Sequence, residues 1–389
     1  MSLPLGFQYA TTYAGIRKTT KDDLAIVVSD RPASVAAVFT QNVVCAAPVQ
    51  LSRKHLKQSK GIARVFLVNA GNANAATRTG AKVAIETSKA LAQALNIPVN
   101  QVIPSSTGVI GVELDAAKIT RAIPTLINGL SEGNFEEVSN CILTTDLVAK
   151  VAHAEIKTRK GAIQIVGCTK GSGMIHPNMA TTLGFIMTDA LVKPVQLQKA
   201  LKKGISTSYN RITVDGDTST NDMVAVMANG ASSIKPDAKE FEAALALVLE
   251  SLAKQIARDG EGARKLVTVD VTGAKTEADA DRIGRAISNS PLVKTAVAGA
   301  DPNWGRILCA AGYAGVKFDP SKVDILFQGQ PVCKNGLAVD FDEAALTEKL
   351  KSDEVQIQFK LRGAGKSSAR FWTCDFTEGY IEINGSYRT

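Results

Sequence analysis

The stretch KGSGMIHPNMATTLGF (170–185) decides the fold prediction, because its small and turn-forming residues separate two apolar runs. AIQIVGCT (162–169) comes before it and LGFIMT (183–188) closes it, and each run has the length and composition of a buried strand. Two glycines and a proline between the runs disfavour regular structure. The chain is therefore predicted to leave one strand, turn, and enter the next at about Leu183.

Ala180, Thr181 and Thr182 stand at the entry to that second strand. A strained peptide bond before a threonine can be attacked by the threonine's own hydroxyl, and water then cleaves the resulting ester. The new α-amine, with a pKa of about 7.7–8, can deprotonate the neighbouring hydroxyl without help from a histidine. The residues alone favour an ordinary structural turn over this chemistry, and their spacing does not choose between Thr181 and Thr182.

Further short apolar runs predict additional strands. These runs are LAIVVS (24–29), VAAVF (about 36–39), RVFLV (64–68), RITVD (211–215), LVTVDV (266–271), VDILFQ (323–328), VQIQFKL (355–361) and the alternating YIEI near the C-terminus. One helix is predicted after Pro236, apolar on one face and ending at Gly260, and another from Pro194 to about Gly204. Because strands cluster as well as alternate with helices, the sequence indicates an α+β fold in layers.

The composition is that of a soluble globular protein with a large core. The chain has 389 residues, of which 45% are apolar and 21% charged, and its mean hydropathy is +0.04. The net charge of +8 is scattered, and aromatic residues make up only 5%. A nucleic-acid stacking surface is therefore not expected, whereas attraction of acidic metabolites is.

The cysteines and histidines give no sign of a disulfide framework or a metal site. Six cysteines are widely spaced without a C-x-x-C pair, and the three histidines show no ligand spacing. The N-terminus lacks the layout of a signal peptide, and no run of about 18 apolar residues suggests a membrane span. These features lead us to expect a cytoplasmic protein with no metal and no membrane partner.

Beyond these residue patterns, the chain resembles the ornithine acetyltransferases, the bifunctional glutamate N-acetyltransferase (ArgJ) family. KGSGMIHPNMATTLGF is similar to the hallmark segment of that family, and other segments match in the same order along nearly the whole chain. The other matching segments are GFQYATTYAGIRKTTKDDLAIVVSD near the start, NAGNANA (69–75), SSTGVIG (105–111), TTD (144–146), VDGDTSTND (214–222), RDGEGARK (258–265), ADPNWGRI (300–307) and INGSYRT (383–389).

The resemblance implies a layered α/β sandwich in two lobes, with N-terminal-nucleophile architecture. The precursor would cut itself between Ala180 and Thr181, giving an α chain (1–180) and a β chain (181–389) that assemble as α2β2. Thr181 would take acetyl from N²-acetylornithine, release ornithine, and pass the acetyl group to glutamate in a ping-pong cycle of arginine biosynthesis. No cofactor or metal is implied. Some members also use acetyl-CoA to acetylate glutamate directly, and the sequence leaves open whether this chain does.

The resemblance also implies roles for residues outside the cleavage segment. Thr107 and Gly108 match the oxyanion hole of the family, a role suited to a hydroxyl and an unobstructed backbone N–H. Lys170 would present a positive charge to a substrate carboxylate or to the scissile segment. Without the resemblance, the first pair would be taken as part of a glycine-containing turn and Lys170 as a solvated side chain.

The remaining substrate contacts come from three other segments. Glu261, predicted directly after the long helix, offers a carboxylate suited to an amino group of ornithine, although a solvated charge at a helix end is the simpler interpretation. Asn384 and Thr389 match contact positions in the tail that closes over the substrate in the family. Either Thr144 or Thr145 matches a further contact, and the sequence does not distinguish them.

Two rival functions use the same residues differently. An N-terminal-nucleophile amidase or aminopeptidase would use Thr181 but transfer the acyl group to water, and a metabolite-binding protein would keep an uncut chain. Departures from the family pattern occur at MATTL, where MATML is frequent, in TTDLVAK (144–150), where Thr and Pro commonly follow Asp, and after Asn384. None of them removes a reacting group, so they affect expected substrate preference rather than chemistry.

Overall fold

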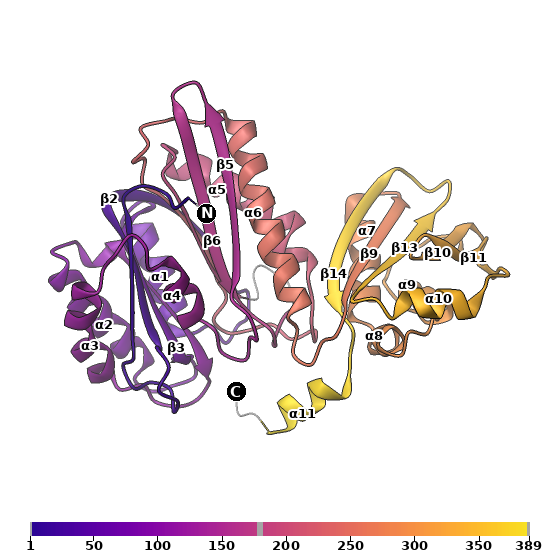
Figure 1. The fold of residues 1–389 in the computed structure, drawn as a ribbon, viewed down its shortest axis with the longest axis horizontal. Coiled ribbons are helices and arrows are strands. Elements are labelled where there is room, and N and C mark those ends of the chain that lie inside the picture. The colour runs from indigo at the N-terminus through magenta and orange to yellow at the C-terminus, as the bar shows by residue number, and fades with distance from the viewer. Residues whose placement is uncertain (1, 177–181, 387–389) are drawn as a thin grey trace.

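The computed structural model describes residues 2–176 and 182–386, which form two lobes, each built around one β-sheet. Figure 1 shows the first lobe in indigo to orange and the second in orange to yellow, with the C-terminal helix extending back below the space between them. This arrangement confirms the predicted α+β fold and its layered, two-lobed form.

The first lobe contains an eight-stranded sheet in the order β4-β3-β2-β8-β7-β6-β5, with β1 paired to β2. Its strands are β1 (Phe7–Thr12), β2 (Leu24–Phe39), β3 (Ile62–Asn72), β4 (Val102–Val109), β5 (Lys150–Thr158), β6 (Gly161–Lys170), β7 (Leu183–Thr188) and β8 (Met223–Ala228). The apolar runs that flank the 170–185 stretch are β6 and β7, which pair antiparallel, and β7 pairs parallel with β8.

The long strand β2 joins two halves of this sheet that pack face to face. Its first part pairs with β3 and its last part with β8, and the register shifts between Val28 and Ala33. Phe66 of β3 lies 5.3 Å from Phe185 of β7 between ring centroids, within one apolar core that both halves share. The two halves therefore form the inner layers of a sandwich.

Helices cover the outer faces of both halves. Alternate residues of β2 and β3 face the second core with α2 (Gly80–Ala94) and α3 (Ala116–Asn128). Alternate residues of β6, β7 and β8 face α5 (Pro194–Thr207) and α6 (Ala238–Arg258). The shorter α1 (Ala47–Gln58) lies beside β4, and α4 (Phe135–Cys141) beside β1. Because successive side chains of a strand point to opposite faces, these strands contribute both to the inner core and to a core beneath the helices.

The second lobe is a six-stranded sheet with helices on one face. Its order is β12-β11-β10-β13-β9-β14, in which only β9 and β13 pair in parallel. The strands are β9 (Leu266–Ala274), β10 (Val323–Phe327), β11 (Gln330–Lys334), β12 (Leu337–Ala338), β13 (Glu354–Leu361) and β14 (Ser367–Cys374). The helices are α7 (Glu277–Asn289), α8 (Pro291–Ala298), α9 (Trp304–Gly312) and α10 (Glu343–Leu350), followed by α11 (Glu378–Ser386).

Two local predictions are wrong. RITVD (211–215) makes only an isolated bridge, in which Ile212 pairs with Trp372 and the N–H of Thr213 donates to the Trp372 carbonyl. The bridge does not extend, because the N–H of Val214 donates to the carbonyl of Ile175 in the turn. The YIEI segment lies within helix α11. The helix predicted after Pro236 is confirmed as α6, and the one from Pro194 continues beyond Gly204 to Thr207.

Candidate active site

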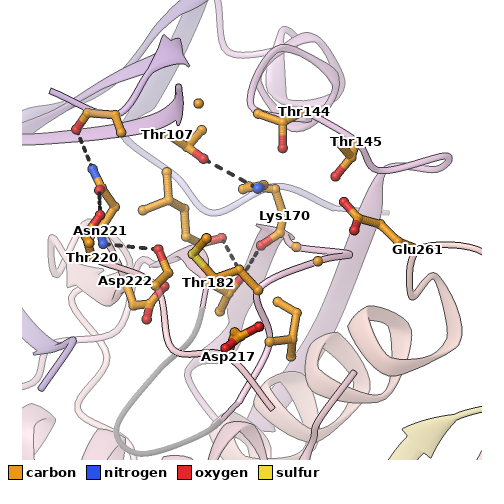
Figure 2. A pocket seen from close by; sticks show the side chains of 18 of the residues that line it. Thr107, Thr144, Thr145, Lys170, Thr182, Asp217, Thr220, Asn221, Asp222 and Glu261 are labelled. Carbon is orange, nitrogen blue, oxygen red and sulfur yellow. Dashed lines mark hydrogen bonds between the residues drawn. The ribbon is translucent and has the colours of Figure 1, made fainter. Parts of the chain in front are cut away.

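A pocket of about 240 Å³ opens where the strands of the first sheet meet the loops after α4 and α6. We call it the sheet-edge pocket. It brings together every described residue that the sequence singled out, and Figure 2 shows several of their side chains converging. These residues are Thr107, Gly108, Thr144, Thr145, Lys170, Glu261 and Asn384. Ala180, Thr181 and Thr389 lie outside the described residues.

Thr107 and Gly108 directly precede Val109, the last residue of strand β4, which runs parallel to β3. Gly108 has φ +126°, and a Cβ there would lie 2.4 Å from the backbone carbon of Gly71. Only glycine fits this close approach without moving β3. The structure thus gives Gly108 a steric reason for being glycine and places its backbone beside the Thr107 hydroxyl at the pocket wall, as Figure 2 shows for Thr107.

Lys170, the last residue of β6, points into the pocket and is not solvated. Its side chain is 12% exposed, and its ammonium lies 3.4 Å from the Thr107 hydroxyl and 4.0 Å from the Asp146 carboxylate. Burial lowers the pKa of Lys170, and the negative charge of Asp146 opposes that change. The simple interpretation of Lys170 as a surface cation is therefore wrong.

Glu261 is also buried, with 8% exposure, three residues after the end of α6. The side-chain amide of Asn384 in α11 donates a hydrogen bond of 2.8 Å to its carboxylate. A Cβ on Gly173 would lie 2.2 Å from the same carboxylate, so the glycine-rich turn leaves the space that Glu261 occupies. The charge belongs to the pocket rather than to a solvated helix end.

Thr144 and Thr145 both line the pocket, but their polar groups are used differently. The Thr145 hydroxyl is hydrogen-bonded to the Ser172 hydroxyl at 2.8 Å. The backbone N–H of Thr144 donates to Asp146 at 3.0 Å. Asp146 therefore fixes the segment that presents both threonines, while Thr145 is tied to the glycine-rich turn.

Thr182 has a structural role in the described part of the turn. Its hydroxyl donates to the backbone carbonyl of Lys170 and lies 3.1 Å from the Thr169 hydroxyl. The carbonyl of Thr182 accepts the N–H of Met223, the first residue of β8. Through these bonds, Thr182 holds the starts of β7 and β8 against the end of β6.

Sequence reasoning missed six polar residues of the VDGDTSTND segment (214–222) that line the sheet-edge pocket, namely Asp215, Asp217, Ser219, Thr220, Asn221 and Asp222. Asp215 accepts the backbone N–H groups of Met174 and Ile175 at 2.6 and 2.9 Å. The segment was part of the family resemblance, but its spacing alone carried no indication of which side chains face the pocket.

Asn221 holds the strand that carries the predicted oxyanion donors. Its amide donates to the carbonyls of Ala73 at 2.6 Å and Ser106 at 2.9 Å. Asp222 is 2% exposed, one of its carboxylate oxygens has no hydrogen-bond partner among the described residues, and burial raises its pKa well above the ordinary value. Burial therefore favours the neutral form of this carboxyl group, whereas the nearby buried cation Lys170 favours the charged form.

Neither a metal centre nor a membrane-spanning helix is present among the described residues. Within residues 2–176 and 182–386, no group of three or more His, Cys, Asp or Glu side chains has an arrangement suited to a metal ion. Over the same part of the chain, every helix is too short or too polar to cross a membrane.

Comparison with known proteins gives matches over nearly the whole chain. A family model described as the ArgJ family matches residues 8–389. The arginine biosynthesis bifunctional protein ArgJ of Dehalococcoides mccartyi is 45% identical over 399 residues, covering 100% of this chain and 97% of that protein. The protein of the same name from Chlorobaculum tepidum is 44% identical over 391 residues, covering 99% and 96%.

A solved structure matches about half of the chain. The crystal structure of the arginine biosynthesis bifunctional protein from Bacillus halodurans is 45% identical, with a TM-score of 0.51. It covers 52% of this chain and 98% of its own chain. The solved polypeptide is therefore only about half as long as the present chain, whereas the curated relatives are about as long as the present chain.

Proposed function

This chain belongs to the ArgJ family, and from that premise we propose that it transfers acetyl from N²-acetylornithine to glutamate in arginine biosynthesis. The observation that carries the proposal is the sheet-edge pocket, which gathers an oxyanion-type pair, a buried cation and a buried carboxylate at the start of β7. A substrate with a carboxylate, an amide and a cationic side chain needs groups of both signs.

Self-cleavage between Ala180 and Thr181 would create the nucleophile. The Thr181 hydroxyl attacks the carbonyl carbon of Ala180, the peptide C–N bond breaks, and water hydrolyses the resulting ester. The α chain (1–180) then ends at Ala180 and the β chain (181–389) begins at Thr181. Two observations support this step: the Thr182 hydroxyl is already engaged by the Lys170 carbonyl, and the solved chain of the Bacillus halodurans relative is about half length.

In the first half of the cycle, the Thr181 hydroxyl attacks the acetyl carbonyl of N²-acetylornithine while the Thr181 α-amine accepts its proton. The tetrahedral oxyanion would be stabilised by the Thr107 hydroxyl and the Gly108 N–H. Collapse breaks the C–N bond, and the proton passes to the departing amine of ornithine. The enzyme is left with an acetyl ester on Thr181. Glutamate then attacks this ester with its own amine, and the same groups act in reverse.

Substrate recognition would divide between the two charges of the pocket. Lys170 is suited to the α-carboxylate, because its ammonium reaches the Thr107 side of the pocket. Glu261 is suited to the ornithine side-chain ammonium, with Asn384 holding its carboxylate. Thr144 is the better candidate for the third contact, since Thr145 is bonded to Ser172. Thr389 keeps the contact role that the family resemblance implies.

The wider properties follow from the same proposal. The cycle requires no metal or cofactor, since the acetyl group moves between two substrates through Thr181. Direct use of acetyl-CoA as a second donor is compatible with the same ester intermediate. The two chains are proposed to remain together as α2β2 in the cytoplasm.

The competing functions are an N-terminal-nucleophile amidase or aminopeptidase and a metabolite-binding protein. Two assays on purified protein separate them from the acetyltransferase. N-terminal sequencing should find a fragment that starts TTLGF, whereas an intact active chain or a start at Thr182 contradicts the nucleophile assignment. With acetylornithine as donor, glutamate should capture the acetyl group in preference to water. Release of acetate regardless of glutamate would instead indicate a hydrolase, and an uncut, inactive chain a binding protein.

A further inference from the structure

Lys150, the first residue of β5, is fully buried and paired with two carboxylates. Its side chain is 0% exposed, and its ammonium lies 2.7 Å from Asp146 and 2.6 Å from Asp259. It also donates to the carbonyl of Val148 at 3.3 Å. A buried lysine is costly unless its charge is compensated, and here three acceptors compensate it.

The two carboxylates connect Lys150 to three of the segments that carry predicted substrate contacts. Asp146 accepts the N–H of Thr144 at 3.0 Å and that of Gly171 at 2.6 Å. Asp259, two residues before Glu261, accepts the N–H of Leu147 at 3.1 Å. The ion pair thus ties the 144–150 segment to the end of β6 and to the loop after α6.

Two ammonium groups share the carboxylate of Asp146, and they do so unequally. Lys150 holds the close position at 2.7 Å, and Lys170 stays at 4.0 Å. Lys170 therefore keeps its ammonium within 3.4 Å of the Thr107 hydroxyl, on the side of the pocket where the acetyl group would react. If Lys150 were absent, Asp146 would have Lys170 as its nearest cation.

We propose that Lys150 is a positioning residue of the sheet-edge pocket: by occupying Asp146, it keeps the Lys170 ammonium directed at the substrate carboxylate. The substrate carboxylate and the kinetic readout rest on the proposed acetyl transfer, whereas the effect of Lys150 on the position and pKa of Lys170 does not. Lys150 itself does not line the pocket, so it acts through Asp146 and does not touch substrate.

The charges around Lys170 predict the direction in which its pKa changes when Lys150 is removed. The groups that act on it are Asp146, Lys150, Asp222 and Glu261. Burial lowers the pKa of Lys170, Asp146 raises it, and Lys150 lowers it further by repulsion between like charges. Removing Lys150 should therefore raise the pKa of Lys170, and the activity lost when Lys170 deprotonates should be lost at higher pH.

The experiment compares Lys150→Met with the double variant Lys150→Met/Asp259→Asn. The single change leaves two buried carboxylates with one fewer cation, and it should lower the melting temperature. The double change removes one charge of each sign and leaves Asp146 with Lys170, so it should recover most of that loss. Lys203→Met/Glu242→Gln is the matched control, because it removes a pair of 2.7 Å that does not line the pocket and whose Lys203 side chain is 69% exposed.

Kinetics of the cleaved protein decide between positioning and a merely structural role. The double variant should show KM values for acetylornithine and glutamate raised at least tenfold, and an alkaline limb of kcat/KM moved to higher pH. The control pair should behave as wild type. If KM and the alkaline limb return to wild-type values together with the melting temperature, Lys150 is structural and the proposal is overturned.

A second readout does not depend on acetyl transfer. Competitive labelling of Lys170 with acetic anhydride across pH, followed by peptide mass spectrometry, reports the pKa of its amine in each protein. The pKa should be higher in the double variant than in wild type or the control pair, even if the substrates proposed above are wrong. An unchanged pKa would overturn the inference whatever the kinetics show.

Discussion

The two sheets of the molecule are buried in different ways, and the difference explains where the pocket lies. Strands β7 and β8 of the first sheet are buried at every position. Strand β13 of the second sheet alternates between buried and more exposed residues. The first sheet is covered on both faces, so polar groups that leave the ends of its strands meet one another in a confined space.

The charges follow the same division. Lys150 and Asp146 pair at the end of the first sheet with both side chains 0% exposed, whereas Arg370 and Asp270 pair on the second sheet with Arg370 54% exposed. A buried pair is little screened, while an exposed pair in water contributes about 0–1 kcal/mol. Removing a charge should therefore alter stability and substrate binding much more at the sheet-edge pocket than on the second sheet.

Glu261→Gln tests the pocket side of this comparison with the largest expected effect. Removing one charge of a desolvated contact should cost about 2–5 kcal/mol, seen mainly as a raised KM for acetylornithine. Binding of ornithine should weaken in parallel, whereas self-cleavage should continue, because the precursor contains no ornithine. Steady-state kinetics at saturating glutamate measure this, and wild-type values would show that Glu261 does not contact substrate.

Thr107→Ala tests the oxyanion pair. Loss of one preorganised donor typically lowers kcat about 100- to 1000-fold, or about 2.7–4 kcal/mol. Because the Thr107 side chain lies at the pocket wall, the variant should fold and melt like wild type. If a variant of normal stability turns over substrate within a few-fold of wild type, Thr107 has a structural role and is not an oxyanion donor.

Asp222→Asn tests burial at the pocket through pH. Burial raises the folded-state pKa of Asp222 above its unfolded value, so wild-type stability should fall as pH rises from the ordinary Asp range through that raised pKa. The variant cannot ionise and should be more stable than wild type at about pH 8 by roughly 1–3 kcal/mol. The difference in melting temperature should shrink toward pH 4 or so. If the difference in melting temperature between wild type and Asp222→Asn is the same at both pH values, burial does not raise the pKa of Asp222.

Arg370→Gln tests the second sheet, where the smallest effect is expected. Its ion pair with Asp270 is largely solvated, so stability should change by about 1 kcal/mol or less. Neither kcat nor KM should move, because no part of this pair lines the sheet-edge pocket. A tenfold change in KM would mean that the second lobe takes part in substrate binding and would remove the contrast between the sheets.

The fold was predictable where periodicity alone determines structure. The apolar run at 183–188 is β7, and the single apolar face after Pro236 is α6, because buried strands and amphipathic helices leave local patterns. RITVD and YIEI failed because strand formation needs a partner that the local sequence does not specify. The joining of the predicted strands LAIVVS and VAAVF into the single strand β2 was likewise not visible in the sequence, since it depends on pairing with β3 and β8.

The site was predictable only in part, for a related reason. Thr107, Lys170 and Glu261 were found through a resemblance, and the structure shows that they converge. Lys150 and Asp259 were not found, because their pairing spans 109 positions and a lysine in TTDLVAK resembles any surface lysine. Burial distinguishes such a charge, and burial of a single polar residue leaves no periodic trace in the sequence.

The central claim is that Thr181 carries the acetyl group between the two substrates, and mass spectrometry of the intact protein tests it most directly. After brief exposure to acetylornithine without glutamate, the fragment that starts TTLGF should carry one acetyl group, mapped to Thr181. Addition of glutamate should remove this group and yield N-acetylglutamate. An unmodified fragment during turnover, or an acetyl group elsewhere that glutamate does not discharge, would contradict the account.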